Sequence, residues 1–342
     1  MASLLVGVMV ISLVLYALLG GADYGAGVWD LFSAGPSKEA QKELIANAIQ
    51  PIWEANHVWL ILIIVLLFSG FPPAFGVVMV ALHIPILLML AGIVLRGSSF
   101  VFRAYSTTNS RMQRACAYVF SIASCFTPVF AGIIVGAISG EYVLVSHDAS
   151  VNGYIFNWLN PFTLSMGLLT LTLFAFLAAA YLTVEAPTED LRISFRRRAA
   201  FAGLVAAAIS MLLYTLSERY ASGLRISLIH NPFSLGSALM SLACLVLAFI
   251  AIFGRRDRLL RGMASVSVGA IVVAWACAQY PYLIRPGQTI FNSVVSETVV
   301  HDVVLASAAG AIVLFPSLGL LLYIFKDQRR TRTVSSSTSV RL

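Results

Sequence analysis

Charged residues are scarce in this chain. They make up 11% of its 342 residues, whereas a typical soluble domain carries about 25%. Hydrophobic residues account for 59%, and many of them form repeated apolar runs of about 20 residues, the length that spans a bilayer as a helix. Strands of a membrane β-barrel would alternate apolar and polar residues instead. The composition therefore predicts an all-α polytopic membrane protein.

Cysteine motifs are also lacking. The four cysteines lie singly inside apolar runs, and none belongs to a C-x-x-C pair or to a C-x-x-C-H haem-attachment motif. Isolated cysteines in apolar runs are typical of small buried hydrophobic residues. The sequence therefore predicts neither a disulfide framework nor a covalently attached haem.

Other informative patterns are missing. No Lys or Arg precedes the first apolar run at Leu4, so a cleavable signal peptide is not expected. Nothing resembles a phosphate-binding loop, a dinucleotide fold or a zinc site. The net charge of +7 does not predict nucleic-acid binding, because the basic residues lie in short loops between apolar runs.

The apolar runs predict nine membrane spans. These are expected at about 4–30, 53–69, 74–97, 115–139, 162–184, 199–217, 233–253, 262–280 and 302–325. Residues 36–50 predict a short amphipathic surface helix, with Leu44, Ile45 and Ile49 on its apolar side. Asn-Pro-Phe at 160–162 and 231–233 predicts two helix starts, each with an Asn cap before a Pro. The tail from 326 to 342, rich in Ser, Thr and Arg, is expected to be disordered.

The distribution of basic residues predicts the orientation. Loops after odd-numbered spans, together with the tail, hold 19 of the 22 Lys and Arg residues, and the opposite side holds Arg219, Arg225 and Arg285. Cytoplasmic loops carry the excess of basic residues in membrane proteins. We therefore expect the N-terminus on the periplasmic side and the C-terminus in the cytoplasm.

Two acidic motifs at the ends of apolar runs are the strongest candidates for chemistry. Asp23, in GGADYGAG at 20–27, lies about 28 Å into the first helix at about 1.5 Å per residue, and Glu54 begins the returning second helix. Both acids are thus expected at a similar depth near the cytoplasmic edge. Acids bounded by hydrocarbon usually face a bundle interior or a wet cavity, which favours a proton-conducting or ion-binding pair. The alternative is that both are interfacial, solvated or paired with Arg96 or Arg103.

His57 lies one helical turn after Glu54, so the two side chains share a face. Its imidazole could relay protons, ligate a haem or pack as a polar residue, and relay or packing is favoured. The pair Glu54 and His57 is too sparse to close a metal site by itself. Trp53, Asn56 and Trp59 flank the pair and are expected to support it.

Several of these motifs together resemble a known family. GADYGAG at 21–27, PIWEANHVW at 51–59, FPP at 71–73 and RGSSFVFR at 96–103 are similar to subunit II of the cytochrome bd-type quinol oxidases, most of all to the cyanide-insensitive branch. These motifs cover the first third of the chain. The better-known branch has Asp and Gln where this chain has Glu54 and His57, so the imidazole adds a titratable group to the family pattern.

The resemblance implies two four-helix bundles and one peripheral helix. We expect the first bundle, with the acidic motifs, in 1–140, the second bundle and the ninth helix in 141–325, and the disordered cytoplasmic tail in 326–342. It also implies a partner, subunit I, that holds the haems and the quinol site, leaving this chain without haem ligands. Whether those haems include haem d or only haem b is left open, as are a small accessory single-helix subunit and a bound structural quinone or lipid.

The resemblance further implies a place in the bacterial inner membrane, within an enzyme that oxidises quinol and reduces O₂ to water. In the family, the acids of the first two helices are associated with proton uptake, which assigns Asp23 and Glu54 as proton carriers and His57 as an orienting or relay group. Arg96 and Arg103 would tune these acids or bind anionic lipid. Two alternatives remain: an ion-coupled secondary transporter, since glycine-broken helices with membrane acids occur there too, and a purely structural scaffold.

Overall fold

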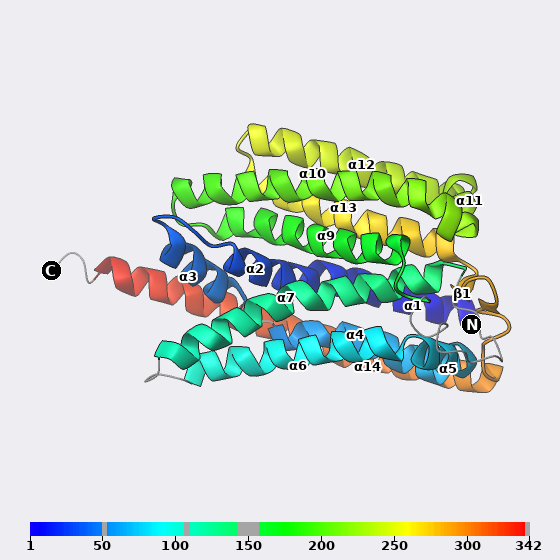
Figure 1. The fold of residues 1–342 in the computed structure, drawn as a ribbon. Coiled ribbons are helices and arrows are strands. Elements are labelled where there is room, and N and C mark those ends of the chain that lie inside the picture. Colours follow the sequence, from blue (N-terminus) through cyan, green and yellow to red (C-terminus); the bar gives the residue numbers. More distant parts are fainter. Residues whose placement is uncertain (50–52, 106–109, 142–156, 339–342) are drawn as a thin grey trace.

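In the computed structural model, which describes residues 1–49, 53–105, 110–141 and 157–338, long helices run side by side along one axis (Figure 1). Eight described helices are long and apolar enough to cross a membrane, or nine if one sharply bent pair is a single span. The predicted all-α polytopic class is confirmed. The boundaries of the two predicted bundles stay a prediction.

The first half of the chain folds into one interrupted helix, a short surface helix and four further helices. These are α1 (Ala2–Leu15), the π-helix η1 (Tyr16–Gly20), α2 (Gly21–Leu31), α3 (Lys38–Ile49), α4 (Trp53–Gly70), α5 (Pro72–Ala81), α6 (His83–Tyr105) and α7 (Ser110–Ser139). The predicted amphipathic helix is α3, and its Ile45 is buried.

The second half adds six helices and a small antiparallel sheet. These are α9 (Pro161–Glu185), α10 (Glu189–Tyr220), α11 (Ser222–His230), α12 (Pro232–Phe253), α13 (Asp257–Gln279), β1 (Tyr282–Ile284), β2 (Gln288–Thr289) and α14 (Glu297–Thr338). Both predicted Asn caps are present: the Asn160 side chain accepts a hydrogen bond from the Thr163 amide, and that of Asn231 accepts one from the Phe233 amide. These bonds fix the starts of α9 and α12.

The third span departs from the prediction. A continuous helix was expected over 74–97, but the membrane helix α6 begins at His83, and residues 72–81 form the separate helix α5. The axis turns by 118° between α4 and α5. Pro72 and Pro73 cause this break, because proline has no amide hydrogen to continue the hydrogen bonds of the preceding helix. The expected start of the third span at residue 74 is therefore wrong.

The last helix extends further than expected. Its backbone is helical to Thr338, whereas the ninth span was predicted to end at 325. The helix therefore continues into the segment that was expected to be a disordered tail. Residues 339–342 lie outside the described part of the chain. In its first half, α14 packs along α4 and α1, and no residue of its most apolar stretch is buried.

Helix α9 lies at the centre of the fold, packed against α2, α7, α10 and α13. Helix α2 approaches α9 especially tightly at one point. A Cβ atom on Gly25 would lie 1.9 Å from the carbonyl oxygen of Phe174, so only glycine permits this approach. The Trp29 indole donates a 2.7 Å hydrogen bond to the carbonyl of Ala175. These contacts hold α2, which carries Asp23, rigidly against the core.

The charged turns gather at one end of the molecule. Figure 1 shows α3, the α9–α10 turn, the α12–α13 turn and the C-terminal half of α14 at the same end, and the N-terminus, α11 and β1 at the other. We call the first of these the basic end. These loops lie at one end of the molecule, as predicted for the loops that follow odd-numbered spans. The assignment of the basic end to the cytoplasm stays a prediction.

Candidate functional site

A buried ion pair joins the first helix to α6. The Arg96 Nη2 atom lies 2.7 Å from Asp23 Oδ1, and the two side chains are only 2% and 6% exposed. The same Nη2 also donates to the Asp23 carbonyl at 3.3 Å, and Nε donates to Ser124 Oγ of α7 at 3.0 Å. Three helices therefore meet at one guanidinium. The predicted alternative of pairing with Arg96 is realised, but inside the protein and not in a solvated interface.

The guanidinium also has aromatic partners. Its central carbon lies 4.6 Å from the centroid of the Tyr24 ring and 4.8 Å from that of Phe120. A weakly hydrated, planar cation suits such a setting better than a lysine ammonium would. Arg96 thus has the two rings and the Ser124 hydroxyl as partners in addition to Asp23.

The π-helix η1 connects this pair to α4. A π-turn shifts the backbone hydrogen-bond pattern and is frequent at functional sites. Here the Asn56 side chain donates a 3.4 Å hydrogen bond to the Leu19 carbonyl inside η1. The His57 ring lies edge-on to Tyr24, with centroids 6.2 Å apart, and 6.5 Å from Tyr16. Asn56 and His57 of α4 thereby pack against η1 and against Tyr24, the residue that follows Asp23.

The predicted site residues are placed to different degrees. Asp23, Arg96, Asn56 and His57 lie in one region, with Tyr24 between His57 and Arg96. Trp59 is buried, and its ring lies 6.1 Å from that of Phe315 in α14. The backbones of Glu54, Trp53 and Arg103 belong to α4 and α6, but their side chains lie outside what the structure describes. The predicted pairing of Asp23 with Glu54 therefore stays a prediction.

The sequence reasoning missed Asp30. This residue lies in the last turn of α2, is 4% exposed, and accepts a 2.8 Å hydrogen bond from Ser121 Oγ of α7. The available signal was its position seven residues after Asp23, which places both acids on the same face of a helix. Tyr24 was missed as well, because an aromatic residue in an apolar run usually indicates packing alone.

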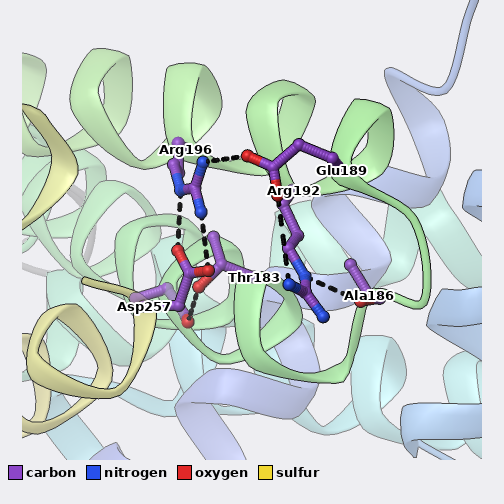
Figure 2. A network of polar contacts seen from close by, with 7 residues as sticks. Thr183, Ala186, Glu189, Arg192, Arg196 and Asp257 are labelled. Carbon is purple, nitrogen blue, oxygen red and sulfur yellow. Dashed lines mark hydrogen bonds and ion pairs between the residues drawn. The ribbon is translucent and has the colours of Figure 1, made fainter. Parts of the chain in front are cut away.

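A second polar network lies at the basic end (Figure 2). Arg196 donates to both carboxylate oxygens of Asp257 and to Glu189, each at 2.7 Å. Arg192 donates to the Ala186 carbonyl at 3.1 Å. The network ties the α9–α10 turn to the start of α13, and two parallel Arg–carboxylate bonds provide strong, directional contact. We interpret it as a structural clamp between helices.

The described residues contain no cluster of side chains suited to a metal ion. Among them, no group of three or more His, Cys, Asp or Glu side chains could hold a metal. His83 Nδ1, at the start of α6, is 2.8 Å from the Val80 carbonyl of α5, and His230 Nδ1 is 2.9 Å from the Ile226 carbonyl of its own helix α11.

Known proteins resemble this chain over most of its length. A "Cytochrome bd ubiquinol oxidase subunit 2" of Bacillus subtilis is 22% identical over 264 residues, covering 76% of this chain and 75% of that protein. The "Cytochrome bd-I ubiquinol oxidase subunit 2" of Escherichia coli K12 is 26% identical over 221 residues, covering 63% and 54%. A chain of the bd oxidase from Geobacillus thermodenitrificans has the same fold, with a TM-score of 0.80, 21% identity and coverage of 95% and 98%.

The family assignment rests on a match to nearly the whole sequence. Residues 1–325 match the family described as "Cytochrome bd terminal oxidase subunit II". The match extends well beyond the motifs in the first third of the chain, so it supports the resemblance in regions that contain none of them. The family match supports the predicted oxidase subunit and not the alternative of a transporter. The chain belongs to the family of subunit II of the cytochrome bd terminal oxidases.

Proposed function

We propose that this chain stabilises a haem-bearing subunit I in the bacterial inner membrane and carries protons from the cytoplasm toward the site of O₂ reduction. The relatives are named as ubiquinol oxidase subunits, which supports quinol as the electron donor of the whole complex. The haems and the quinol site belong to the partner in this proposal, and this chain supplies part of the proton uptake.

The buried pair of Asp23 and Arg96 carries the proposal. Desolvating two charges costs several kcal/mol per ion before their attraction is counted, so a purely structural role could be filled more simply by apolar packing. The pair lies where η1 interrupts the first helix, and the Asn56 side chain of α4 donates a hydrogen bond to a carbonyl of η1. An ionisable residue inside a membrane segment indicates a functional site by default.

The contacts of Arg96 make a change of charge at Asp23 tolerable. When a proton arrives and neutralises the carboxylate, the guanidinium retains the rings of Tyr24 and Phe120 and the hydroxyl of Ser124. The proton can then leave again, and the ion pair re-forms. Asp23 is thus proposed as the inner carrier, Glu54 at the start of α4 as an outer carrier, and His57 as the group that relays or orients between them.

Replacing Glu54 by Gln tests this function. In the purified two-subunit oxidase, we expect Glu54→Gln to lower quinol-driven O₂ consumption about tenfold, because a relay loses its titratable group, while assembly and the haem absorbance spectrum stay unchanged. Glu297→Gln is the matched control: Glu297 is an exposed acid in the first turn of α14, at the other end of the molecule. Full assembly with wild-type turnover in Glu54→Gln would contradict the proton-carrying role and leave the scaffold role.

A further inference from the structure

Asp30 is a second buried acid that the proposed function does not use. It lies at the basic end of α2, it is 4% exposed, and its Oδ2 accepts a 2.8 Å hydrogen bond from Ser121 Oγ. The following residues lead to α3 on the surface of that same end (Figure 1). Asp30 therefore lies between the surface and the ion pair of Asp23.

Asp30 and Asp23 lie on one face of α2. Seven residues turn a helix by about 700°, only about 20° short of two full turns, and advance it by about 10.5 Å. Both acids are connected to α7: Asp30 to Ser121 directly, and Asp23 to Ser124 through Arg96. The two serines are one helical turn apart on α7. The contacts thus follow one seam between α2 and α7.

Gly27 makes this seam unusually close. It lies between the two acids on α2, and a Cβ atom there would fall 2.2 Å from Ser124 Oγ and 2.4 Å from Ser124 Cβ. No other residue leaves room for the serine at this point. The approach brings the hydroxyls of α7 directly against the backbone that carries both acids, and Ser121 and Ser124 are 2% and 0% exposed.

The hydroxyls along the seam can change partners. Ser121 Oγ lies 2.8 Å from Asp30 Oδ2 and 3.0 Å from the Ala117 carbonyl, and it has one proton to donate. A serine hydroxyl can donate to a carboxylate and accept from a carboxylic acid, so Ser121 keeps its contact with Asp30 in both protonation states. Ser124 Oγ accepts from Arg96 Nε at 3.0 Å and donates to the Phe120 carbonyl at 2.7 Å.

We propose that Asp30 is a further proton-carrying residue of this chain, which takes protons from the basic end and passes them inward along the seam between α2 and α7 to Asp23. This inference rests on the proposed function. The Asp30 carboxylate binds a proton delivered by water at the basic end and becomes a carboxylic acid, with Ser121 as its hydrogen-bond partner. It then releases the proton to water in the seam, and that water delivers it to the Asp23 carboxylate. No electron is transferred and no co-reactant is consumed in this step.

The test uses the purified two-subunit oxidase with a soluble quinol. We expect Asp30→Asn to lower turnover about tenfold, because a positioned proton carrier contributes at least this much to a proton-transfer step, and to raise the solvent isotope effect of O₂ consumption in D₂O. Asp30→Glu, which restores a carboxylate, is expected to recover turnover to within about twofold of wild type. Ser121→Ala is expected to fall between Asp30→Asn and wild type.

The controls separate proton transfer from structure. Asp190→Asn removes an exposed carboxylate in the first turn of α10, also at the basic end, and is expected to leave turnover and isotope effect unchanged. A purely structural role for Asp30 would lower assembly or thermal stability without changing the isotope effect of the assembled enzyme. That result, or wild-type turnover in assembled Asp30→Asn, would overturn the inference.

The comparison with Glu54→Gln distinguishes this inference from the proposed function. If Glu54→Gln is slow and Asp30→Asn is not, the function stands and the inference fails. If neither variant is slow, both fail. If Asp30→Asn does not assemble, Ser121→Ala decides, because wild-type turnover and isotope effect in that variant would show that the seam carries no protons.

Discussion

Removing either partner of the buried ion pair is expected to have unequal consequences. The Asp23 carboxylate forms its ion pair with Arg96, whereas Arg96 also contacts Ser124 and two aromatic rings. Arg96→Met therefore leaves a buried carboxylate without a positive partner, which costs about 3–5 kcal/mol. Asp23→Asn keeps a hydrogen-bond acceptor beside a guanidinium that has other partners, so its cost is expected to be smaller.

The double variant Asp23→Asn/Arg96→Met sharpens this prediction. Two unit charges about 4 Å apart attract by about 4 kcal/mol at an effective dielectric constant of about 20, and part of this is offset by desolvation. A coupling energy of about 2–3 kcal/mol is therefore expected between the two positions. A methionine at position 96 can contact the rings of Tyr24 and Phe120 through favourable sulfur–aromatic interactions. The double variant should thus be more stable than Arg96→Met alone.

The assay is the rate of irreversible thermal inactivation of the assembled oxidase, followed by haem absorbance and by size-exclusion chromatography. The expected order of stability is wild type, Asp23→Asn, the double variant, then Arg96→Met. Arg225→Met, which removes a partner from the exposed ion pair with Glu218, is the control and should change the rate little. If the effects of the two buried substitutions simply add, the charges are not coupled and the reasoning is refuted.

Two further predictions concern helix packing. Gly25→Ala places a methyl group 1.9 Å from the Phe174 carbonyl oxygen, so α2 must move away from α9, at a cost of about 1–3 kcal/mol or more in stability. Gly236→Ala is the control, because the space around Gly236 is open. Equal yields of assembled complex for the two variants would contradict the close approach of α2 to α9. Arg196→Lys keeps the charge but loses the two parallel bonds to Asp257, so thermal stability should fall with turnover unchanged in the surviving enzyme. An unaltered melting temperature would show that the network of Figure 2 is no clamp.

The sequence alone revealed the class and most helices of this protein, because the hydrophobic length required to span a bilayer leaves a direct pattern of apolar runs. Capping residues and prolines act locally, so the starts of α9 and α12 were also predictable. Local signals were not enough at the third span, which was predicted to start at residue 74. Pro72 and Pro73 end α4, but the pattern of hydrophobicity does not show that the helix axis then turns by 118° and that the next membrane helix begins only at His83.

The candidate site required the tertiary structure for its partners. Asp23 and the arginines were recognisable as unusual residues in apolar surroundings, and two possible partners, Arg96 and Arg103, could be named. Which arginine pairs with Asp23 depends on how α2, α6 and α7 pack, and that packing is decided by contacts between residues distant in sequence, such as Gly27 against Ser124. Asp30 was overlooked for the same reason, because nothing near it in sequence shows that a serine 91 residues later buries it.

The sequence by itself thus determined a bundle of membrane helices with acids near one end, since burial of hydrocarbon and the scarcity of charge act residue by residue along the chain. Only the tertiary structure decided that Asp23 is buried in an ion pair with Arg96, whose guanidinium contacts two aromatic rings, and that Asp30 joins the same seam through Ser121. The physical reason is that the state of a buried charge depends on the few groups within hydrogen-bond distance, and helix packing brings those groups together from separate parts of the chain.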